Sequence, residues 1–202
     1  MTDWASRETR NGETLTKRVW ALLEDAYAAA GIDPSALVVT QGSWSAGSLS
    51  GSTHLGGGAF DLRSWTVPPA RLEPLVVELR RRNVCAWFRD QAHGGFQPHV
   101  HGIVRDEPGL SSGAQWQVAE YDRGYDGLTR RGKDYHPRPT QQHFDPEADM
   151  ALSDEDVQRI AEAVWRRVVK VDGEDKKMGA MAVTCYKAAR VQLPSGMADE
   201  PA

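Results

Sequence analysis

Apolar residues recur at three- and four-residue intervals in three stretches of the chain, the spacing of a helix with one buried face. The first stretch covers residues 13–30 and stops at Gly31, a residue type that often follows the last turn of a helix. The second follows the Pro-Pro pair at 68 and 69 and stops at Asn83, and the third covers residues 112–121. The apolar positions that predict the first two helices are Leu15, Val19, Leu22, Ala26, Leu72, Leu75, Val76 and Leu79.

Short apolar runs between these helices predict four strands, at residues 36–40, 59–63, 84–88 and 99–104. The stretch 41–58 is rich in Ser and Gly, which indicates a loop. The elements therefore follow one another as helix, strand, strand, helix, strand, strand. This order predicts an α+β fold, with a small, largely antiparallel sheet flanked by helices.

The last part of the chain reads differently from the rest. Residues 123–142 are polar and contain Gly and Pro, which predicts a surface loop in which His136 is exposed. We predict a main domain over residues 1–142, a linker over 143–151 that carries an exposed His143, and a helical tail over 152–202. In the tail, Ser153 caps an apolar stripe, and residues 178–191 form a second helical stretch. Such a stripe needs a partner surface, so we expect self-association (a homo-oligomer) or docking through the tail.

Composition narrows the function classes. Hydrophobic residues make up 40% and charged residues 26% of the 202 residues, which is typical of a globular protein with its own core. The net charge of −4 predicts no nucleic-acid partner. Without a long apolar run or a signal peptide, we expect no membrane insertion. Cys85 and Cys185 stand far apart without a paired spacing, which favours two reduced, buried thiols.

The candidate chemistry lies in two short stretches. His54 and Asp61 are separated by a run that contains three glycines, which allow a chain to fold back closely on itself. His99 and His101 are two residues apart in a predicted strand, so their side chains point to the same side. An H-x-H pair or a Gly-rich loop is common without any metal, and only their combination predicts a metal site.

Two imidazoles and one carboxylate suit zinc, which binds nitrogen and oxygen ligands readily. Three protein ligands leave a position for water, and that is typical of a catalytic zinc site. A fourth protein ligand, either His93 or His99, would instead indicate a structural site. The residues alone do not choose between His99 and His101 as the ligand, because both face the same way.

The stretch Ser52–Asp61 matches the pattern S-x-H-x-x-G-x-A-x-D at every fixed position: Ser52, His54, Gly57, Ala59 and Asp61. In this the chain resembles the zinc D-alanyl-D-alanine carboxypeptidase family of peptidoglycan peptidases, and His99-x-His101 fits the family's second motif. Residues 41–47 and 110–139 resemble catalytic domains of endolysins from phages of actinobacteria. The resemblance covers residues 12–140 and implies the sheet-and-helix fold shared by hedgehog domains and these DD-peptidases.

The resemblance implies that His54, Asp61 and His101 bind Zn²⁺ and that His99 assists catalysis, either by stabilising the tetrahedral intermediate or by moving a proton. Related enzymes often have a glutamate just before the second motif as the general base. Here residues 96–98 read Phe-Gln-Pro, without a glutamate. His99 is therefore the first candidate for the base, and Asp90 and His93 are the next.

Six residues are candidates for substrate contacts: Gln41, Ser43, Trp44, Ser52, Tyr121 and Arg123. Many relatives have an arginine in a Gly-aromatic-Arg stretch before the first motif, whereas this chain has Gln41, Ser43 and Trp44 there. Trp44 is a better candidate for a cleft than Trp87 and Trp116, which the strand and helix patterns place in the core.

We therefore expect a phage endolysin-type zinc peptidase that hydrolyses a peptide bond in bacterial peptidoglycan, with the stem peptide as its partner. It would be made in the host cytoplasm and would act on the cell wall after release. The alternative is a catalytically impaired zinc-containing module that binds the wall, which the missing glutamate favours. In either case the tail is an oligomerisation or targeting element.

Overall fold

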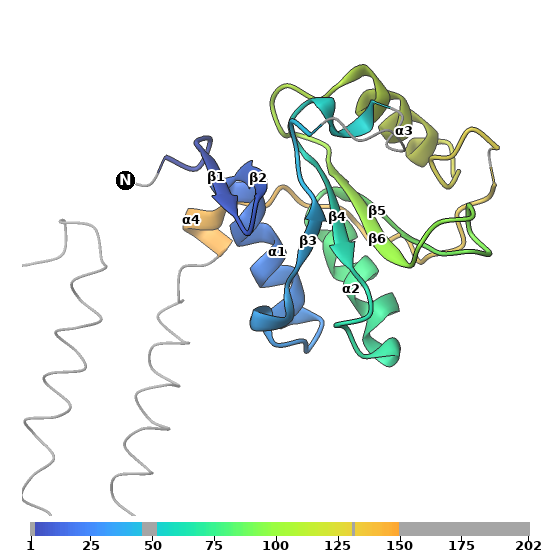
Figure 1. Cartoon of the computed structure of the whole chain (residues 1–202), viewed down its shortest axis with the longest axis horizontal. Coiled ribbons are helices and arrows are strands. Elements are labelled where there is room, and N and C mark those ends of the chain that lie inside the picture. Colours follow the sequence, from blue (N-terminus) through green and yellow to red (C-terminus); the bar gives the residue numbers. More distant parts are fainter. Residues whose placement is uncertain (1–2, 46–51, 131, 150–202) are drawn as a thin grey trace, which may run out of the picture. The chain divides into compact units, whose positions relative to one another are not determined.

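A computed structural model describes residues 3–45, 52–130 and 132–149 of the chain. The fold is α+β, as predicted, with antiparallel sheets and helices on both sides of the larger sheet (Figure 1). The strands are β1 Arg7–Arg10, β2 Glu13–Thr16, β3 Val39–Gln41, β4 Ala59–Arg63, β5 Val84–Arg89 and β6 His99–Val104. The helices are α1 Lys17–Ala29, α2 Pro69–Arg81, α3 Ser112–Asp122 and α4 Pro146–Asp149, with short 3₁₀ turns η1 Pro34–Ala36 and η2 Thr53–Leu55.

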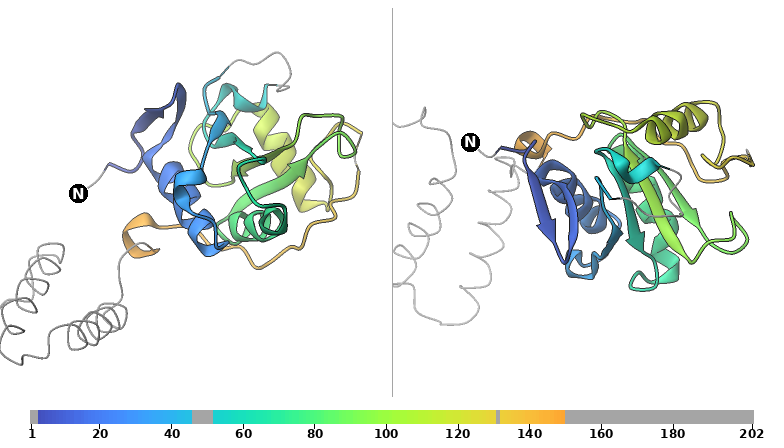
Figure 2. Two further views of the ribbon diagram at one scale, coloured as in Figure 1. Left: turned by 60° about the horizontal axis from the view of Figure 1, so that its bottom comes forward. Right: turned by 45° about the horizontal axis from the view of Figure 1, so that its top comes forward.

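The larger sheet has the strand order β3-β4-β6-β5, and every neighbouring pair is antiparallel. Successive side chains of a strand point to opposite faces, so β4 and β6 each contribute to two surfaces. Phe60 and Leu62 join the main core with Val100 and Val104 on the face covered by α1 and α2. Helix α3 lies on the other face of the sheet (Figure 2). This face carries a smaller apolar cluster that includes Ala59, Cys85, Trp87 and Ile103 together with Ala114 and Tyr121 of α3.

The start of the first helix differs from the prediction. Residues 13–16 form strand β2, which pairs with β1 through a tight turn at Asn11 and Gly12, both with positive φ. An Asn-Gly pair is the usual sequence of a two-residue hairpin turn, and this signal overrides the helical spacing of Leu15. The helix starts at Lys17, because the Thr16 side chain accepts a hydrogen bond from the Val19 amide.

Most other boundaries agree with the prediction. The second and third helices and the strands at 59–63, 84–88 and 99–104 are found within one or two residues of the expected positions. Asn83 adopts a left-handed conformation directly after α2, which explains why the helix ends there. The strand expected at 36–40 is shifted to Val39–Gln41, since Pro34 and the Asp33 cap make residues 34–36 a 3₁₀ turn.

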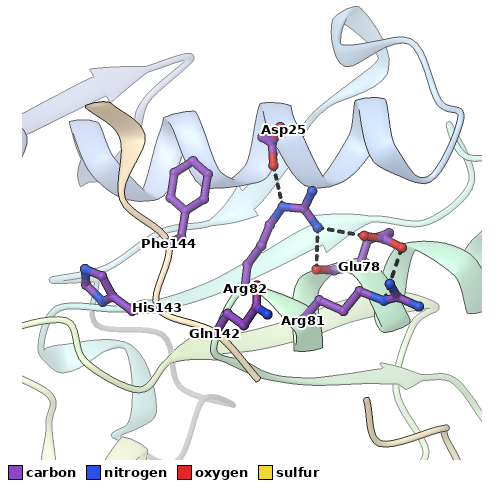
Figure 3. A pocket seen from close by; sticks show the side chains of 7 residues that line it. All are labelled: Asp25, Glu78, Arg81, Arg82, Gln142, His143 and Phe144. Carbon is purple, nitrogen blue, oxygen red and sulfur yellow. Dashed lines mark hydrogen bonds and ion pairs between the residues drawn. The ribbon is translucent and has the colours of Figure 1, made fainter. Parts of the chain in front are cut away.

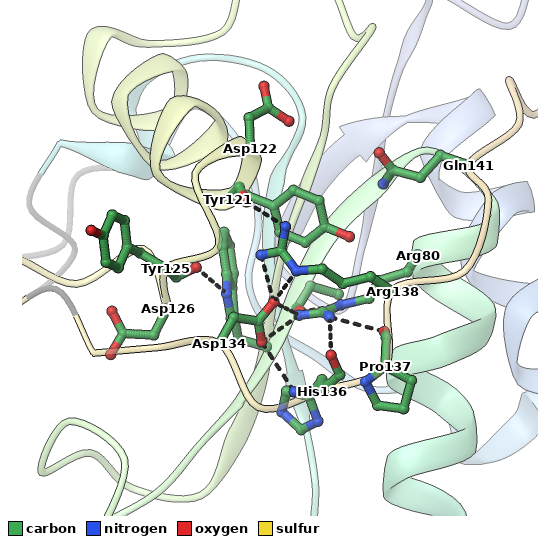
Figure 4. A network of polar contacts seen from close by, with 12 residues as sticks. Arg80, Tyr121, Asp122, Tyr125, Asp126, Asp134, His136, Pro137, Arg138 and Gln141 are labelled. Atoms are coloured by element: carbon green, nitrogen blue, oxygen red, sulfur yellow. Dashed lines mark hydrogen bonds and ion pairs between the residues drawn. The ribbon is translucent and has the colours of Figure 1, made fainter.

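The segment after α3 is tied to the fold by a buried ion pair (Figure 4). Arg80 of α2 and Asp134 are both fully buried, with Nη2 and Oδ2 2.8 Å apart. Arg80 also donates hydrogen bonds to the carbonyl oxygens of Ala86, His136 and Pro137. Residues 123–142 therefore form a loop over the domain, as predicted, and the buried pair anchors its second half to α2.

His136 was expected to be exposed, and this expectation is wrong. Its side chain is buried, with Nε2 accepting a hydrogen bond from the Phe88 amide and Nδ1 lying 2.7 Å from a Glu73 oxygen. The ring satisfies an amide at the edge of β5, which a polar sequence pattern does not reveal. His143, by contrast, is largely exposed as expected.

Several predictions concern residues that the structure does not describe. The predicted tail helices and Cys185 lie within residues 150–202, outside the described ranges. The predicted homo-oligomer depends on those helices. The described part of the predicted linker, residues 143–149, includes Phe144, whose side chain is buried in the main core. Cys85 is buried on β5, and burial raises the pKa of its thiol to about 12. No helix in the described ranges is long and apolar enough to cross a membrane.

Candidate metal centre

The backbone around η2 folds His54 back beside β4. The turn packs closely against the loop after β6: a side chain at Gly57 would come within 2.6 Å of the Pro108 carbonyl oxygen. Gly58 has a φ of +79°, which other residues rarely adopt. The glycines between His54 and Asp61 thus do what their spacing suggested, since the chain could not take this path with larger residues.

His54, Asp61 and His101 lie together on the α3 side of the sheet. One candidate ligand atom from each side chain lies within 4.8 Å of the other two, so the three residues could hold a metal ion. The His54 Nε2 and His101 Nδ1 atoms are 3.6 and 2.6 Å from the two Asp61 oxygens. Asp61 and His101 are cross-strand partners on β4 and β6, which fixes their separation. We refer to these three residues as the triad.

Each triad histidine has one ring nitrogen near Asp61, the inner nitrogen, and one that faces away from it, the outer nitrogen. Each outer nitrogen faces an oxygen of the fold. His54 Nδ1 lies 3.0 Å from the Gly42 carbonyl oxygen, and His101 Nε2 lies 2.7 Å from the Gln117 side-chain oxygen. The Gln117 amide nitrogen donates in turn to the Thr53 hydroxyl, which sets the orientation of the amide. With this orientation, each outer nitrogen carries the proton, and the inner nitrogens present lone pairs.

The charge states also suit a cation. Burial, together with the charge of nearby Arg89, lowers the pKa of the His101 imidazole to about 3, so the ring is neutral near pH 7. Burial disfavours the charged form of Asp61, but the nearby His101 and His54 outweigh it and hold the pKa of this carboxyl below its usual range. A neutral His101 has one N–H, which Gln117 receives. Its other nitrogen, Nδ1, lies 2.6 Å from an Asp61 oxygen, so both atoms face the place where a metal ion could bind.

His99 lies at the edge of the triad rather than within it. Its Nδ1 lies 2.6 Å from the Gln97 carbonyl oxygen, and its Nε2 is 3.8 Å from an Asp61 oxygen. Among the described residues, the cluster of candidate ligand atoms includes neither His99 nor His93. The arrangement therefore offers three protein ligands and one histidine nitrogen directed toward them.

The remaining candidate bases pair with each other. The Asp90 carboxylate accepts a hydrogen bond from the His93 amide, and its Oδ1 lies 2.8 Å from the His93 ring nitrogen Nδ1. The His93 ring also packs on Tyr135. These contacts hold both residues in the turn between β5 and β6.

The residues proposed for substrate contact have different surroundings. Gln41 is the cross-strand partner of Asp61, so it lies beside the triad. Ser43 is buried, and its hydroxyl donates to the Ala59 carbonyl oxygen. Trp44 has a φ of +55° and packs against the Arg7 guanidinium, 3.9 Å from the ring centre.

The other three candidates for substrate contact lie in different parts of the fold. Ser52 is exposed at the start of η2, next to the turn that carries His54. Tyr121 is buried in the cluster under α3 and contacts Arg138, so it belongs to the core rather than to a rim. Arg123 is mostly exposed and pairs with Glu120 of the preceding turn. Trp87 is buried as predicted, whereas Trp116 is only partly buried.

Two groups near the triad were not found from the sequence. Gln117 and Thr53 support His101 from α3 and η2, and Arg89 influences both His101 and Asp61 through its charge. Thr53 lies inside the matched signature at a variable position. Gln117 and Arg89 occur in unremarkable helix and strand patterns, where no sequence signal marks them.

A surface pocket between α1, α2 and the segment 142–144 is shown in Figure 3. Its charged groups are already paired: Arg82 with Asp25 and Glu78, and Arg81 with Glu78. The pocket contains none of the triad residues, and its ion pairs suit attachment of α1 to α2.

Comparison with known proteins provides no relative to guide the assignment. No family model, curated protein or solved structure matches the chain. The assignment of a function therefore rests on the residues and their geometry.

Proposed function

We propose that the chain is a zinc peptidase that hydrolyses a peptide bond in bacterial peptidoglycan, as an endolysin would. The observation that supports this most directly is the group of His54, Asp61 and His101, with each outer histidine nitrogen held by an oxygen of the fold. Nitrogen and oxygen ligands in this number suit zinc better than the harder cations Mg²⁺ and Ca²⁺, which prefer oxygen. The signature that spans Ser52 and Asp61 provides the reason for choosing peptidoglycan.

A bound zinc ion would supply Lewis-acid chemistry: it would polarise the amide carbonyl and lower the pKa of a bound water toward neutrality. The protein's own part is then to hold the substrate and to move protons. His99 is suited to proton transfer, because its Nδ1 is held by the Gln97 carbonyl and its Nε2 points toward Asp61. We propose that this nitrogen accepts the proton lost by the attacking water and returns it to the leaving amine.

The alternative, a zinc-containing module that binds the wall without cutting it, has one observation in its favour. The stretch where relatives often have a catalytic glutamate reads Phe96-Gln97-Pro98, and its Gln97 offers only a side-chain amide. An amide cannot act as a general base, so without His99 the site would have no base at this position.

The test is mass spectrometry of muropeptides released from purified cell walls by the full chain. The proposal expects new peptide termini at one type of bond, loss of release after treatment with a chelator, and recovery on addition of zinc. The position of the new termini identifies the bond as D-Ala–D-Ala, L-Ala–D-Glu or a cross-bridge. Release that persists without metal would contradict a zinc mechanism.

The same preparations separate the two candidate functions. A binding module would sediment with the walls and release no peptide at any zinc concentration. A peptidase would release peptide until its substrate was exhausted, and the Asp61→Ala variant would release none under the same conditions.

A further inference from the structure

Arg89 is the last residue of β5 and lies one step from the triad on the same face of the sheet. It pairs across the strands with His99, which pairs on its other side with Arg63. The neighbouring row contains Asp61, His101 and Trp87. Two residues along a strand correspond to roughly 7 Å, so a row of two arginines around His99 runs beside the row that carries two triad residues.

The Arg89 guanidinium is buried, and two of its nitrogens lack hydrogen-bond partners in the described part of the chain. The residue is 6% exposed, and its Nε and Nη2 atoms have no hydrogen-bond partner among the described residues. The Nε atom of Arg63 is in the same situation. Buried donors are nearly always satisfied in folded proteins, and an unpaired charged donor is especially unfavourable. Two such groups in one row indicate a place where an acceptor binds.

The surroundings of Arg89 favour an anion. Its guanidinium lies over the rings of Trp87 and Phe96, 5.5 and 5.7 Å from their centres. Asp61 and Asp126 attract it, but neither forms an ion pair with it in the described part of the chain. Burial lowers the pKa of Arg89 to about 10, so it remains a cation near neutral pH. Apolar walls strengthen the attraction of this cation for any anion that reaches it.

The net charge of the metal site together with Arg89 also favours an anion. A divalent cation held by one carboxylate, Asp61, leaves an excess of positive charge, and Arg89 adds to it. Without an anion, Arg89 would weaken metal binding, since like charges repel across a buried site. An anionic group of the substrate would balance both cations at once.

We propose that Arg89, with Arg63 in the same row, forms a carboxylate-binding subsite that holds an acidic group of the peptide next to the bond to be cut. This inference rests on the proposed function. The planar guanidinium fork matches the two oxygens of a carboxylate. A peptide offers two sources of that group, its C-terminus and an acidic side chain, and both present the same chemistry to Arg89.

Binding can be observed without catalysis, on the full metal-free chain. We suggest NMR of the arginine Nε–H signals during addition of three probes: N-acetyl-D-Ala-D-Ala, its C-terminal amide, and a dipeptide amide whose sole carboxylate is a glutamate side chain. The Arg89 signal, identified by its loss in Arg89→Lys, should shift with at least one acid and not with the simple amide. The acid that shifts it identifies the source. A signal that responds to neither acid, or equally to the neutral amide, would overturn the proposal.

Kinetics on the zinc-loaded chain give the second measurement, the ratio of kcat/KM for a carboxylate substrate to that for its amidated counterpart. Loss of a charge-assisted hydrogen bond predicts that Arg89→Gln lowers this ratio roughly 10- to 100-fold, with Arg89→Lys between the two. Arg81→Gln is the matched control, because Arg81 is an exposed arginine on α2, which covers the opposite face. Its ratio should equal that of the wild type.

A purely structural Arg89 would lower kcat/KM for both substrates equally and leave the ratio unchanged, which would refute the subsite. Different outcomes would contradict the peptidase proposal and the subsite proposal. Binding of an acid by Arg89 in a chain that takes up no zinc would keep the subsite and reject the peptidase. Zinc-dependent cleavage with equal rates for acid and amide would keep the peptidase and reject the subsite.

Discussion

The two faces of the four-stranded sheet are built from alternate residues of the same strands, yet they differ in kind. On one face, Phe60 and Leu62 pack against α1 and α2 in an apolar core. On the other, their neighbour Asp61 lies with His54 and His101 among buried polar groups under α3. Because alternate residues of a strand point to opposite faces, residues 59–63 contribute both to the apolar core and to the candidate metal site. Changes on the first face should alter folding, and changes on the second should alter metal binding.

The adjacent residues Asp61 and Leu62 give the strongest test of this separation. We expect Asp61→Ala to abolish zinc binding and peptide release, since it removes the one carboxylate of the triad. Leu62→Ala should cost about 2–5 kcal/mol of unfolding free energy, because it leaves a cavity in the main core. Its folded fraction should still bind one zinc per chain.

Denaturant unfolding of the metal-free chain, together with metal analysis, measures both effects. Equal loss of zinc in the folded forms of the two variants would show that the faces are not independent.

The second largest effect is expected at His99, within the triad face. If His99 moves protons and does not bind the metal, His99→Ala should keep the zinc content and lower kcat about 10²- to 10⁴-fold. His54→Ala should lose the zinc. Metal analysis and steady-state rates on the same preparations check this division, and equal zinc loss in the two variants would contradict the role assigned to His99.

Gln117 should have a smaller effect. Its side-chain oxygen holds His101, and removal of such a supporting contact typically weakens metal binding about 10- to 100-fold. We expect this loss for Gln117→Ala in a competition with a zinc chelator. Gln115→Ala is the matched control, because Gln115 is exposed on the same helix and its side chain donates to the Leu110 carbonyl oxygen. An unchanged zinc affinity in the Gln117 variant would remove α3 from the metal centre.

The smallest effect is expected at a junction between the faces, where Arg18 of α1 pairs with Asp106 after β6. Burial opposes ionisation of Asp106, but hydrogen bonds from Arg18 and His143 outweigh it and lower the pKa of the carboxyl to about 2. The ionised group thus stabilises the fold above its unfolded pKa of about 3.9, and this contribution disappears as the pH falls toward 2.

Because the pair is partly exposed, Asp106→Asn should cost at most about 1 kcal/mol at pH 6. The difference from the wild type should shrink as the pH falls below 4 and vanish below about pH 2. Thermal unfolding at several pH values measures it, and a pH-independent difference would exclude the ion pair as its source.

The sequence predicted those elements of the fold that depend on residues close together in the chain. The period of two in β4 and β6, the prolines at the start of α2 and the left-handed Asn83 are each determined by a few neighbouring residues, and the structure agrees with them. The hairpin before α1 was missed although Asn11 and Gly12 announce it, because Leu15 also fits the helical spacing.

The site was predictable only where its residues lie close in the sequence or fit a signature. His54 and Asp61 belong to one motif, and His101 follows from strand alternation. Gln117, Arg89 and the buried pair of Arg80 and Asp134 depend on contacts between distant segments. A sequence pattern carries no record of such contacts.

If His54, Asp61 and His101 hold one zinc ion, native mass spectrometry of the full chain should detect it. The chain is stripped of metal, supplied with one equivalent of zinc and compared with the Asp61→Ala variant. We predict a mass increase of one zinc ion for the wild type and none for the variant. A wild type that remains metal-free, or a variant that takes up zinc equally well, would contradict the account.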